Sequence, residues 1–258
     1  MTSTTGLRAR VRAELVQEIK DEARRQVAEA GAAALSLRAV ARQVGMVSSG
    51  IYRYFPSREQ LLTALIIDAY DAIGIATESA DAACRRTDFT GRWRAACHAV
   101  RDWALEHPHE YALAYGSPVP GYNAPEDTIE PASRVTMVLA AVVCEAAASG
   151  ALRGPFAPQQ TPALSKPASA EAARAGAAVL AGVPADAVVR ALTAWTQLFG
   201  FVNFEVFGRF VGVVQDMDAL FDQAVTDIGA FVGFPPIGAP ASTNPHFVEV
   251  VRTRNNAG

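Results

Sequence analysis

The sequence predicts an all-α protein with two folded parts, and three observations support this prediction. Half of the 258 residues are hydrophobic and alanine is prominent, which suits a large helical core. Apolar residues recur three and four positions apart along most of the chain, as in amphipathic helices. A compact series of caps and turns fills residues 37–62. We therefore expect an N-terminal three-helix unit at residues 1–62, a larger helical unit at 63–232 and a flexible tail at 233–258.

The first expected helix runs from about Val11 to Ala30. Gly31 can end this helix, because glycine adopts a left-handed backbone conformation without steric cost. The buried face repeats every four residues, at Val11, Leu15, Ile19, Ala23 and Val27.

The next expected helix spans residues 37–44. Ser36 precedes it and can cap its free backbone N–H groups. Gly45 follows it and can take the left-handed conformation that ends a helix. Its apolar face, at positions i, i+3, i+4 and i+7, consists of Leu37, Val40, Ala41 and Val44.

A second, shorter helix of this motif is expected at Gly50–Phe55. The serines at 48–49 offer hydroxyls before its start, and Pro56 discourages its continuation. Ser57 and Gln60 then form a capping box, which predicts the start of another helix. A helix, a glycine turn, a short helix and a new helix in this order are typical of a helix-turn-helix motif.

The exposed side of the short helix carries hydroxyl, phenol and guanidinium groups, while Ile51 and Phe55 can anchor the helix to a core. Such groups can hydrogen-bond to phosphates or base edges in the major groove of DNA. The spacing alone leaves two interpretations open: a helix that reads DNA, or an ordinary helical hairpin with a solvated face. The exposed residues are Ser48, Ser49, Tyr52, Arg53 and Tyr54.

The run A-R-Q-V-G-M, followed by G-I-Y-R-Y-F-P-S-R-E-Q-L-L, resembles the DNA-binding domain of TetR-type transcriptional regulators over roughly residues 11–66. In that family a glycine turn precedes a helix ending in Tyr-x-His/Tyr-Phe, and a Ser-Lys/Arg-Glu-x-Leu helix start follows. Two positions depart from the pattern. Val47 replaces a capping Ser or Thr. Gly50 replaces Ala or Thr, which lowers the stability of the helix by about 0.5–1 kcal/mol relative to Ala. The matching residues are Gly45, Tyr52, Tyr54, Phe55, Ser57, Arg58, Glu59 and Leu61.

The resemblance implies that double-stranded operator DNA is a partner. It places phosphate contacts on Tyr52, Tyr54 and Arg58, and base-reading positions on residues 48–50. Residues 1–8 are expected to be disordered, so the nearby arginines Arg8, Arg10 and Arg12 could trail along DNA. The full candidate set for DNA contact is Ser36, Arg38, Ser48, Ser49, Gly50, Tyr52, Arg53, Tyr54 and Arg58.

Charge is divided along the chain in a way that agrees with DNA contact by one part only. Residues 1–62 carry ten Lys and Arg against six Asp and Glu, and the remainder carries 13 against 20.

The three cysteines are widely spaced and lack a metal-binding pattern, which indicates a reduced, cytoplasmic protein. No apolar run reaches membrane-span length and no signal peptide is evident, so we expect no membrane contact.

Apolar spacing predicts the helices of the larger unit. We expect no metal and no cofactor, although the run His107-Pro108-His109 leaves a metal site open beside the favoured interpretation, a helix end. A loop is expected at residues 153–167, which hold four prolines. The expected helices are 57 to about 77, 90–106, 108–115, 131–150, 169–181, 184–207 and 216–232.

The helix at 184–207 is apolar almost all round, so it must be buried on two sides, one of them against a partner chain. TetR-type proteins dimerise through two such helices from each subunit. Residues 195–208 also resemble a TetR subgroup named for a Trp-His-Gly signature, with Phe199 in place of the His. Glu205 could bind a cationic ligand, but we favour a polar neighbour across the dimer seam. The interface candidates are Leu198, Val202, Val206, Leu220, Ala224 and Ile228.

These features together predict a homodimeric DNA-binding regulator, a repressor that a small apolar ligand releases from a palindromic operator. A constitutive DNA-binding or interaction protein remains the alternative, and a body filled by its own side chains would distinguish it. An enzyme is not expected, because no convergent acid–base or nucleophile set appears. The ligand-binding candidates are Trp103, Tyr111, Tyr115, Met137, Trp195 and Phe199.

Overall fold

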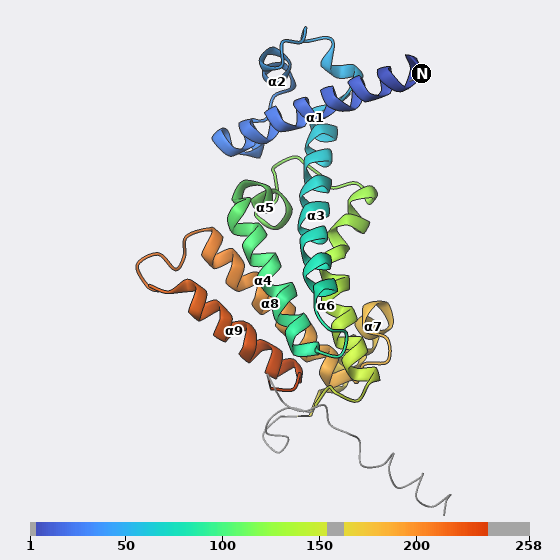
Figure 1. Ribbon diagram of the computed structural model, residues 1–258, viewed down its shortest axis with the longest axis vertical. Helices are drawn as coiled ribbons and strands as arrows, with labels where there is room; N and C mark the ends of the chain where they lie inside the picture. Colours follow the sequence, from blue (N-terminus) through green and yellow to red (C-terminus); the bar gives the residue numbers. More distant parts are fainter. Residues whose placement is uncertain (1–3, 154–162, 237–258) are drawn as a thin grey trace, which may run out of the picture.

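The computed structural model describes residues 4–153 and 163–236, and every regular element in those two ranges is helical. The prediction of an all-α fold is therefore confirmed. The α-helices are α1 (Thr4–Ala30), α2 (Leu37–Gln43), α3 (Arg58–Ala83), α4 (Phe89–Glu106), α5 (Pro108–Tyr115), α6 (Ile129–Ala148), α7 (Lys166–Val179), α8 (Ala185–Val206) and α9 (Met217–Val232), and the 3₁₀ helices are η1 (Ala32–Ala34), η2 (Ile51–Arg53) and η3 (Glu126–Thr128). Figure 1 shows α1 and α2 in a small head, from which α3 runs down into a larger body.

The head closes around an apolar core to which four elements contribute. Ile19 and Ala23 of α1, Val40 of α2, Ile51 of η2 and Leu62 of α3 have no exposed surface. These side chains lie on the faces that the apolar spacing predicted. From Ala69 onward α3 packs into the core of the body, so this one helix belongs to both cores.

Side-chain caps set the starts of α2 and α3. The hydroxyl of Ser36 accepts a hydrogen bond from the backbone N–H of Ala39 at 3.4 Å. The hydroxyl of Ser57 accepts one from the N–H of Gln60 at 3.2 Å. Both caps agree with the sequence prediction, because each N-terminal N–H that a helix leaves free needs an acceptor.

Replacing Ser57 with alanine should lower the free energy of unfolding by about 1 kcal/mol, because the N–H of Gln60 loses its acceptor. Urea unfolding of the purified protein measures this loss. Ser57→Asp keeps an acceptor at the same position and should retain most of the stability. An equal loss in both variants would contradict the capping explanation.

Two expectations for the head were wrong. Helix α1 begins at Thr4 rather than Val11, so the predicted disorder fails for residues 4–8, while residues 1–3 lie outside the described part. No proline interrupts residues 4–10, and extending an existing helix costs little. The short helix expected at Gly50–Phe55 is a single 3₁₀ turn, Ile51–Arg53, because Pro56 and Gly50 both oppose a longer helix.

The body packs α3 against α4 and α6, with α8 and α9 forming an outer pair that Figure 1 shows side by side. Trp93, Leu198 and Phe221 lie at the centre of its core and are almost or completely buried. Helix α3 was expected to end near residue 77, but it continues to Ala83. Expected and observed starts and ends of the other body helices differ by three residues at most.

An ion network explains why α3 continues. Arg92 of α4 has no exposed surface, and its guanidinium lies 2.7 Å from Asp81 of α3 and 2.8 Å from Glu145 of α6. Burial disfavours the charged form of Asp81, yet hydrogen bonds from Arg92 and Arg86 hold its pKa below the usual value. Arg92, Asp81 and Glu145 therefore join three helices at the end of the body opposite the head.

The predicted flexible tail begins with a packed residue. Phe234 is only 2 % exposed, and its ring centroid lies 5.6 Å from that of Trp93. The backbone N–H of Arg153 donates to the carbonyl of Gly233 at 2.8 Å, and the hydroxyl of Thr90 donates to that of Pro235 at 2.6 Å. The tail prediction was therefore wrong for residues 233–235, and residues 237–258 lie outside the described part.

Two segments are long and apolar enough to cross a membrane by length and composition, namely α3 and Glu126–Ala148. Their apolar side chains have another role in this structure. Leu65 and Ile73 of α3 enter the two cores, and Val142 of α6 is fully buried in the body. These segments therefore have the composition of core helices.

Candidate functional site

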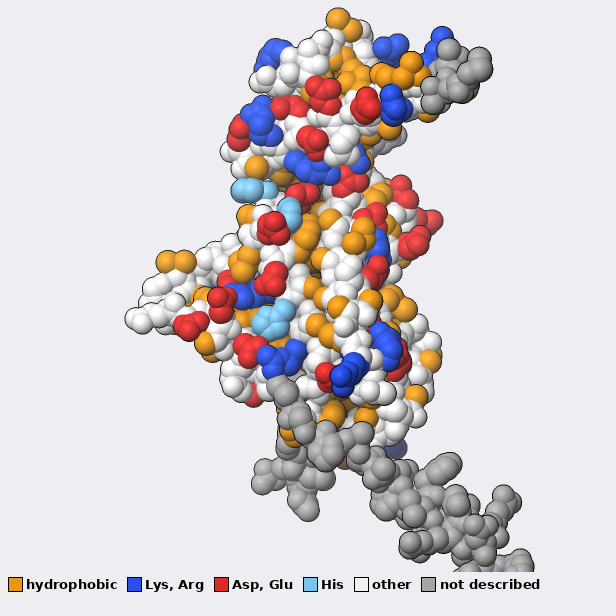
Figure 2. Space-filling model, viewed as in Figure 1, with side chains coloured by type: hydrophobic (Ala, Val, Ile, Leu, Met, Phe, Trp, Pro, Cys, Tyr) orange, Lys and Arg blue, Asp and Glu red, His pale blue; other side chains and the backbone are white. Residues whose placement is uncertain are grey.

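The turn before α3 presents polar side chains at one end of the molecule. Ser48, Ser49, Tyr52 and Arg53 are exposed there, and Arg38 is exposed on the neighbouring α2. Lys and Arg side chains are visible on the head in Figure 2, at the top of the view. The structure thus brings five of the predicted DNA contacts onto the exposed surface of the helix-turn-helix.

Gly50 does not belong to that exposed surface. It is buried, and a Cβ at this position would lie 3.1 Å from both Cγ of Met46 and the carbonyl oxygen of Val47. The family resemblance placed Gly50 among the base-reading positions. Gly50 thus lies in a tightly packed turn, where a Cβ would require its neighbours to shift by a few tenths of an ångström, while Ser48 and Ser49 remain accessible.

Arg58 is occupied by contacts within the head. Its guanidinium donates hydrogen bonds to the carbonyl oxygens of Ala32 at 2.8 Å, Leu35 at 3.1 Å and Ala33 at 3.3 Å. These carbonyls belong to the connection between α1 and α2, to which Arg58 adds hydrogen bonds beyond those of its own backbone. Arg58 therefore has a structural role in the head, and its phosphate contact stays a prediction. Ser36 likewise acts as a helix cap.

Tyr54 is half-buried and contacts α1. The guanidinium carbon of Arg12 lies 5.0 Å from the centroid of the Tyr54 ring, and Arg12 Nη2 donates to the carbonyl oxygen of Arg53 at 3.3 Å. Arg12 was expected on a trailing arm, but it joins α1 to the helix-turn-helix. No signal within the motif indicated this pairing, because the partners are about 40 residues apart in the sequence.

The ligand-binding candidates form a partly continuous row of aromatic rings. Tyr115 lies between Tyr111 at 5.1 Å and Phe199 at 4.7 Å, and Trp195 lies 5.9 Å from Phe199. Burial raises the pKa of both tyrosines, so their phenols stay neutral at ordinary pH. Met137 is 48 % exposed on α6 and is not part of this row.

Trp103 and His107 form a separate stacked pair, with ring centroids 5.0 Å apart. The backbone carbonyl of His107 accepts a hydrogen bond from the N–H of Tyr111, and Pro108 occupies the first turn of α5. The favoured interpretation of this run as a helix end is therefore confirmed. Within residues 4–153 and 163–236 no group of three or more His, Cys, Asp and Glu is placed to hold a metal ion.

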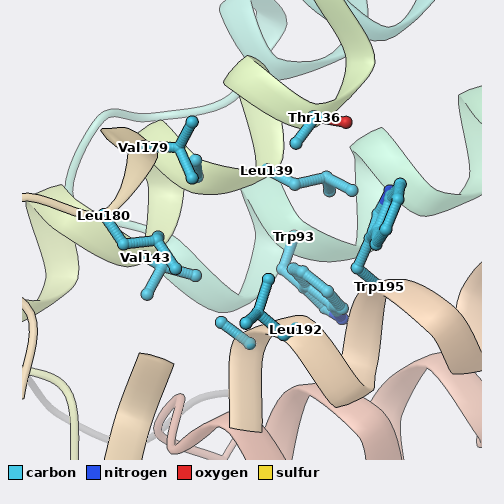
Figure 3. Close-up of a pocket in the computed structure, with 10 residues that line it drawn as sticks. Trp93, Thr136, Leu139, Val143, Val179, Leu180, Leu192 and Trp195 are labelled. Carbon is cyan, nitrogen blue, oxygen red and sulfur yellow. The ribbon is translucent and has the colours of Figure 1, made fainter. Parts of the chain in front are cut away.

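A small cavity in the body is shown in Figure 3. It lies between α4, α6, α8 and the end of α7, and its volume is about 30 Å³. Trp93 and Trp195 line it together with aliphatic side chains such as Leu139, Val143 and Leu192. Trp195 is the only ligand-binding candidate at this cavity, which has room for little more than a water molecule.

A larger, open groove lies where α5 ends beside the C-terminal part of α8, with a volume of about 520 Å³. Tyr115 lines it, together with residues that were not among the predicted ligand-binding residues. Asn203, Phe204, Phe207 and Arg209 were missed because the apolar spacing of α8 assigned its surface to a partner chain. These two hollows of the described part of the body differ, since the cavity is nearly filled and the groove is open.

Comparison with known proteins identifies the family. Residues 19–65 match the family described as "Bacterial regulatory proteins, tetR family", and residues 93–228, more than half of the chain, match "Tetracyclin repressor-like, C-terminal domain". This chain belongs to the TetR family. It is thus a DNA-binding transcriptional regulator with an N-terminal helix-turn-helix, as the resemblance in its sequence implied.

Curated relatives of this TetR-family regulator agree with the assignment. It is 37 % identical over 233 residues to the HTH-type transcriptional regulators Mb1846 of Mycobacterium bovis and Rv1816 of Mycobacterium tuberculosis, covering 86 % of this chain and 93 % of each relative. Among solved structures, regulatory protein SCO4313 is 34 % identical with a TM-score of 0.70, covering 85 % of this chain and 97 % of that one. The regulator PfmR from Thermus thermophilus, 16 % identical with a TM-score of 0.53, covers 83 % of this chain and 96 % of its own and shares the fold.

The surface of α8 and α9 in this TetR-family chain differs from the predicted interface. Leu198 and Val202 have no exposed surface, because they pack into the core of their own subunit. Val206, Ala224 and Ile228 are partly buried, and Leu220 is 39 % exposed. Apolar spacing identified an apolar helix but not which face turns inward. The exposed large hydrophobic residues of this region are Leu192, Trp195, Phe204, Phe207, Val211, Val213, Leu220 and Phe231.

Glu205 has a partner within its own subunit. The guanidinium of Arg101, on α4, forms two hydrogen bonds with the Glu205 carboxylate at 2.7 and 2.6 Å, and a third with Asp218 at 2.8 Å. Hydrogen bonds with Glu205 raise the pKa of Arg101. The expectation of a polar neighbour across the dimer seam is therefore wrong, since the charge is already paired inside the subunit.

Proposed function

We propose that this regulator is a homodimeric repressor that binds a near-palindromic operator and is released by a small molecule bound in its body. The observation that carries the DNA-binding part is the exposed group Ser48, Ser49, Tyr52 and Arg53, held at the tip of the head by the capped start of α3. Hydroxyl and guanidinium groups in this position suit phosphates and base edges. Arg38 adds a second exposed cation on α2.

A second subunit is supported by the apolar surface of α8 and α9. Between 38 % and 41 % of the surface is exposed at Leu192 of α8 and at Leu220 and Phe231 of α9. A surface that concentrates large apolar side chains is typical of a protein interface. Two copies related by a two-fold axis would match the symmetry of a palindromic site. The fully buried residues Leu198 and Val202 are not part of this proposed interface.

Release by a small molecule rests on the open groove and on the connection between body and head. Arg24 of α1 contacts Asp68 of α3 and, at 3.1 Å, Glu110 of α5, so both body helices that meet the head are joined to α1. A ligand that binds more tightly to the DNA-incompetent arrangement would shift the population toward it. The nearly filled cavity of Figure 3 favours the constitutive alternative, whereas the groove favours a ligand.

The same proposal includes a cytoplasmic location and no catalytic activity. The family consists of transcriptional regulators, which supports this part of the proposal. The histidines at 98, 107 and 109 do not form one site. His98 contacts Asp222, and His107 stacks on Trp103.

The test is a titration of the purified protein onto the DNA upstream of its own gene, over a range of salt concentrations. Specific binding at two half-sites about 34 Å apart, with affinity that falls steeply as salt rises, is expected. A control variant, Arg174→Gln, removes one positive charge from the exposed surface of α7, outside the helix-turn-helix. It should bind this DNA as tightly as the original protein does. Binding to this DNA no tighter than to unrelated sequence, together with failure to select any site from random DNA, would contradict the proposal.

A further inference from the structure

The open groove has the shape and size of a small-molecule site. It lies between the last turn of α5, the C-terminal part of α8 and the chain that follows α8, and its volume of about 520 Å³ is within the usual range for ligand pockets. Aromatic rings supply the apolar part of its wall. The lining residues are Ala112, Tyr115, Gly116, Ser117, Asn203, Phe204, Phe207 and Arg209.

One polar atom of a residue that lines this groove, and one of a residue behind its wall, lack a hydrogen-bond partner. The Oδ1 atom of Asn203, a lining residue, is buried and unpaired, and so is the hydroxyl of Tyr111. Tyr111 lies directly behind the wall, stacked on Tyr115 and 6.5 Å from the ring of Phe207. A buried polar atom without a partner is costly, so the unpaired Oδ1 of the lining residue Asn203 supports a ligand in this groove that supplies the missing contact.

The charge at the groove favours an anion. Arg209 is exposed at its rim, and its guanidinium has no ion pair or hydrogen bond with the described residues. No Asp or Glu lines the groove, and the nearby carboxylate of Glu205 is already engaged by Arg101 at 2.6 Å. The side-chain amide of Asn203 can rotate to point its NH₂ group at an anion, since the two ends of an amide are interchangeable in shape.

We propose that this groove binds a small aromatic carboxylate. Arg209 and the amide of Asn203 hold the carboxylate, and the ring lies against Phe204, Phe207 and Tyr115. The proposal rests on the ligand response in the proposed function and adds the chemical class of the ligand and the location of its site.

The same stretch of chain connects the groove to the head. Gly116 and Ser117 begin a segment whose Tyr122 hydroxyl lies 2.9 Å from the hydroxyl of Thr63 on α3. Leu113 of α5, together with Val119 and Tyr122, packs against the core of the head. A ligand wedged against the end of α5 therefore acts on contacts that set the position of the head.

The test uses isothermal titration calorimetry of the full chain with 2-naphthoate and with 2-naphthamide, its neutral counterpart. We expect one naphthoate per subunit and binding of the amide at least tenfold weaker, because only the acid pairs with Arg209. Arg209→Gln should weaken naphthoate binding about tenfold, and Asn203→Leu should weaken it as well. Arg174→Gln removes one exposed positive charge on α7 and should leave the affinity unchanged. Thermal unfolding of each variant verifies that it is folded.

Three results would overturn this site. They are no heat of binding with millimolar naphthoate, equal affinities for acid and amide, or equal affinities in the Arg209→Gln and Arg174→Gln proteins. A gel-shift assay with operator DNA separates this failure from that of the proposed function. If DNA binds normally while naphthoate does not bind, only the site is wrong. If naphthoate binds through Arg209 but no DNA is bound or released, the site stands and the ligand-released repressor is wrong.

Discussion

Replacement of Arg92 with leucine is expected to lower the free energy of unfolding by about 3 kcal/mol. The guanidinium is completely buried and is the hydrogen-bond donor shared by Asp81 and Glu145, so its removal leaves the less exposed carboxylate, Asp81, with only Arg86. The loss should lie at the low end for a buried pair because Glu145 is 42 % exposed and can be hydrated. Urea unfolding followed by circular dichroism measures it.

Arg86 provides the matched control for this experiment. It contacts the same two carboxylates but is 53 % exposed, so Arg86→Leu should lower the free energy of unfolding much less than Arg92→Leu. A similar loss in both variants would mean that burial of Arg92 is not the cause. An Arg92→Leu protein as stable as the original would show that the three-helix network contributes nothing.

The same network predicts how stability depends on pH. The pKa of Asp81 is lower in the folded protein than the value of about 3.9 usual for an unfolded chain. Its contribution to stability is therefore fully present above that unfolded value and is lost as the pH falls through the depressed folded pKa. The difference in unfolding free energy between the original protein and Arg92→Leu should be constant near pH 7 and shrink below about pH 4. A constant difference down to pH 2 would contradict this assignment.

The largest functional effect is expected from the double change Tyr52→Ala with Arg53→Ala. Both side chains are exposed on the 3₁₀ turn of the helix-turn-helix, so their removal should weaken operator binding about 100-fold without unfolding the head. Because the variant lacks the phosphate contact of Arg53, the slope of log affinity against log salt concentration should also fall by about one. Fluorescence anisotropy with labelled operator DNA at several salt concentrations measures both quantities.

Arg58→Ala distinguishes a DNA contact from a structural one. Because Arg58 binds the carbonyls of Ala32 and Leu35, we expect its replacement to destabilise the head, detected as a lower melting temperature. Tyr52→Ala with Arg53→Ala should leave the melting temperature nearly unchanged. If instead Arg58→Ala weakened DNA binding while stability stayed the same, the original prediction of a phosphate contact would be supported.

Local features of the fold could be predicted from the sequence because their causes lie within a few residues. The hydroxyls of Ser36 and Ser57 cap N–H groups three positions ahead, and Gly45 has the positive φ of 68° that its place after a helix required. The family resemblance rests on equally local residues. The fold class and the helix-turn-helix therefore follow from the sequence.

The candidate site was less predictable, because its contacts join distant segments. Glu205 meets Arg101 across 104 positions, and Arg12 reaches Arg53 across 41. No periodicity encodes such pairs. Apolar spacing also could not decide which face of α8 turns inward, so Leu198 was assigned to a partner although it is buried in its own subunit. Phe234 was missed for a similar reason, since a single aromatic residue after a helix gives no pattern.

In the proposed ligand response, α3 would transmit rotation as a stiff rod, because it belongs to the cores of both head and body. Its 26 residues span about 39 Å at 1.5 Å per residue. A rotation of about 5° around its distal end would displace the head by roughly 3 Å, close to the rise of one base-pair step. In the proposed dimer two such displacements in opposite directions would change the separation of the heads by roughly two base pairs. A rearrangement too small to disturb either core is therefore large enough to place the heads out of register with the major groove.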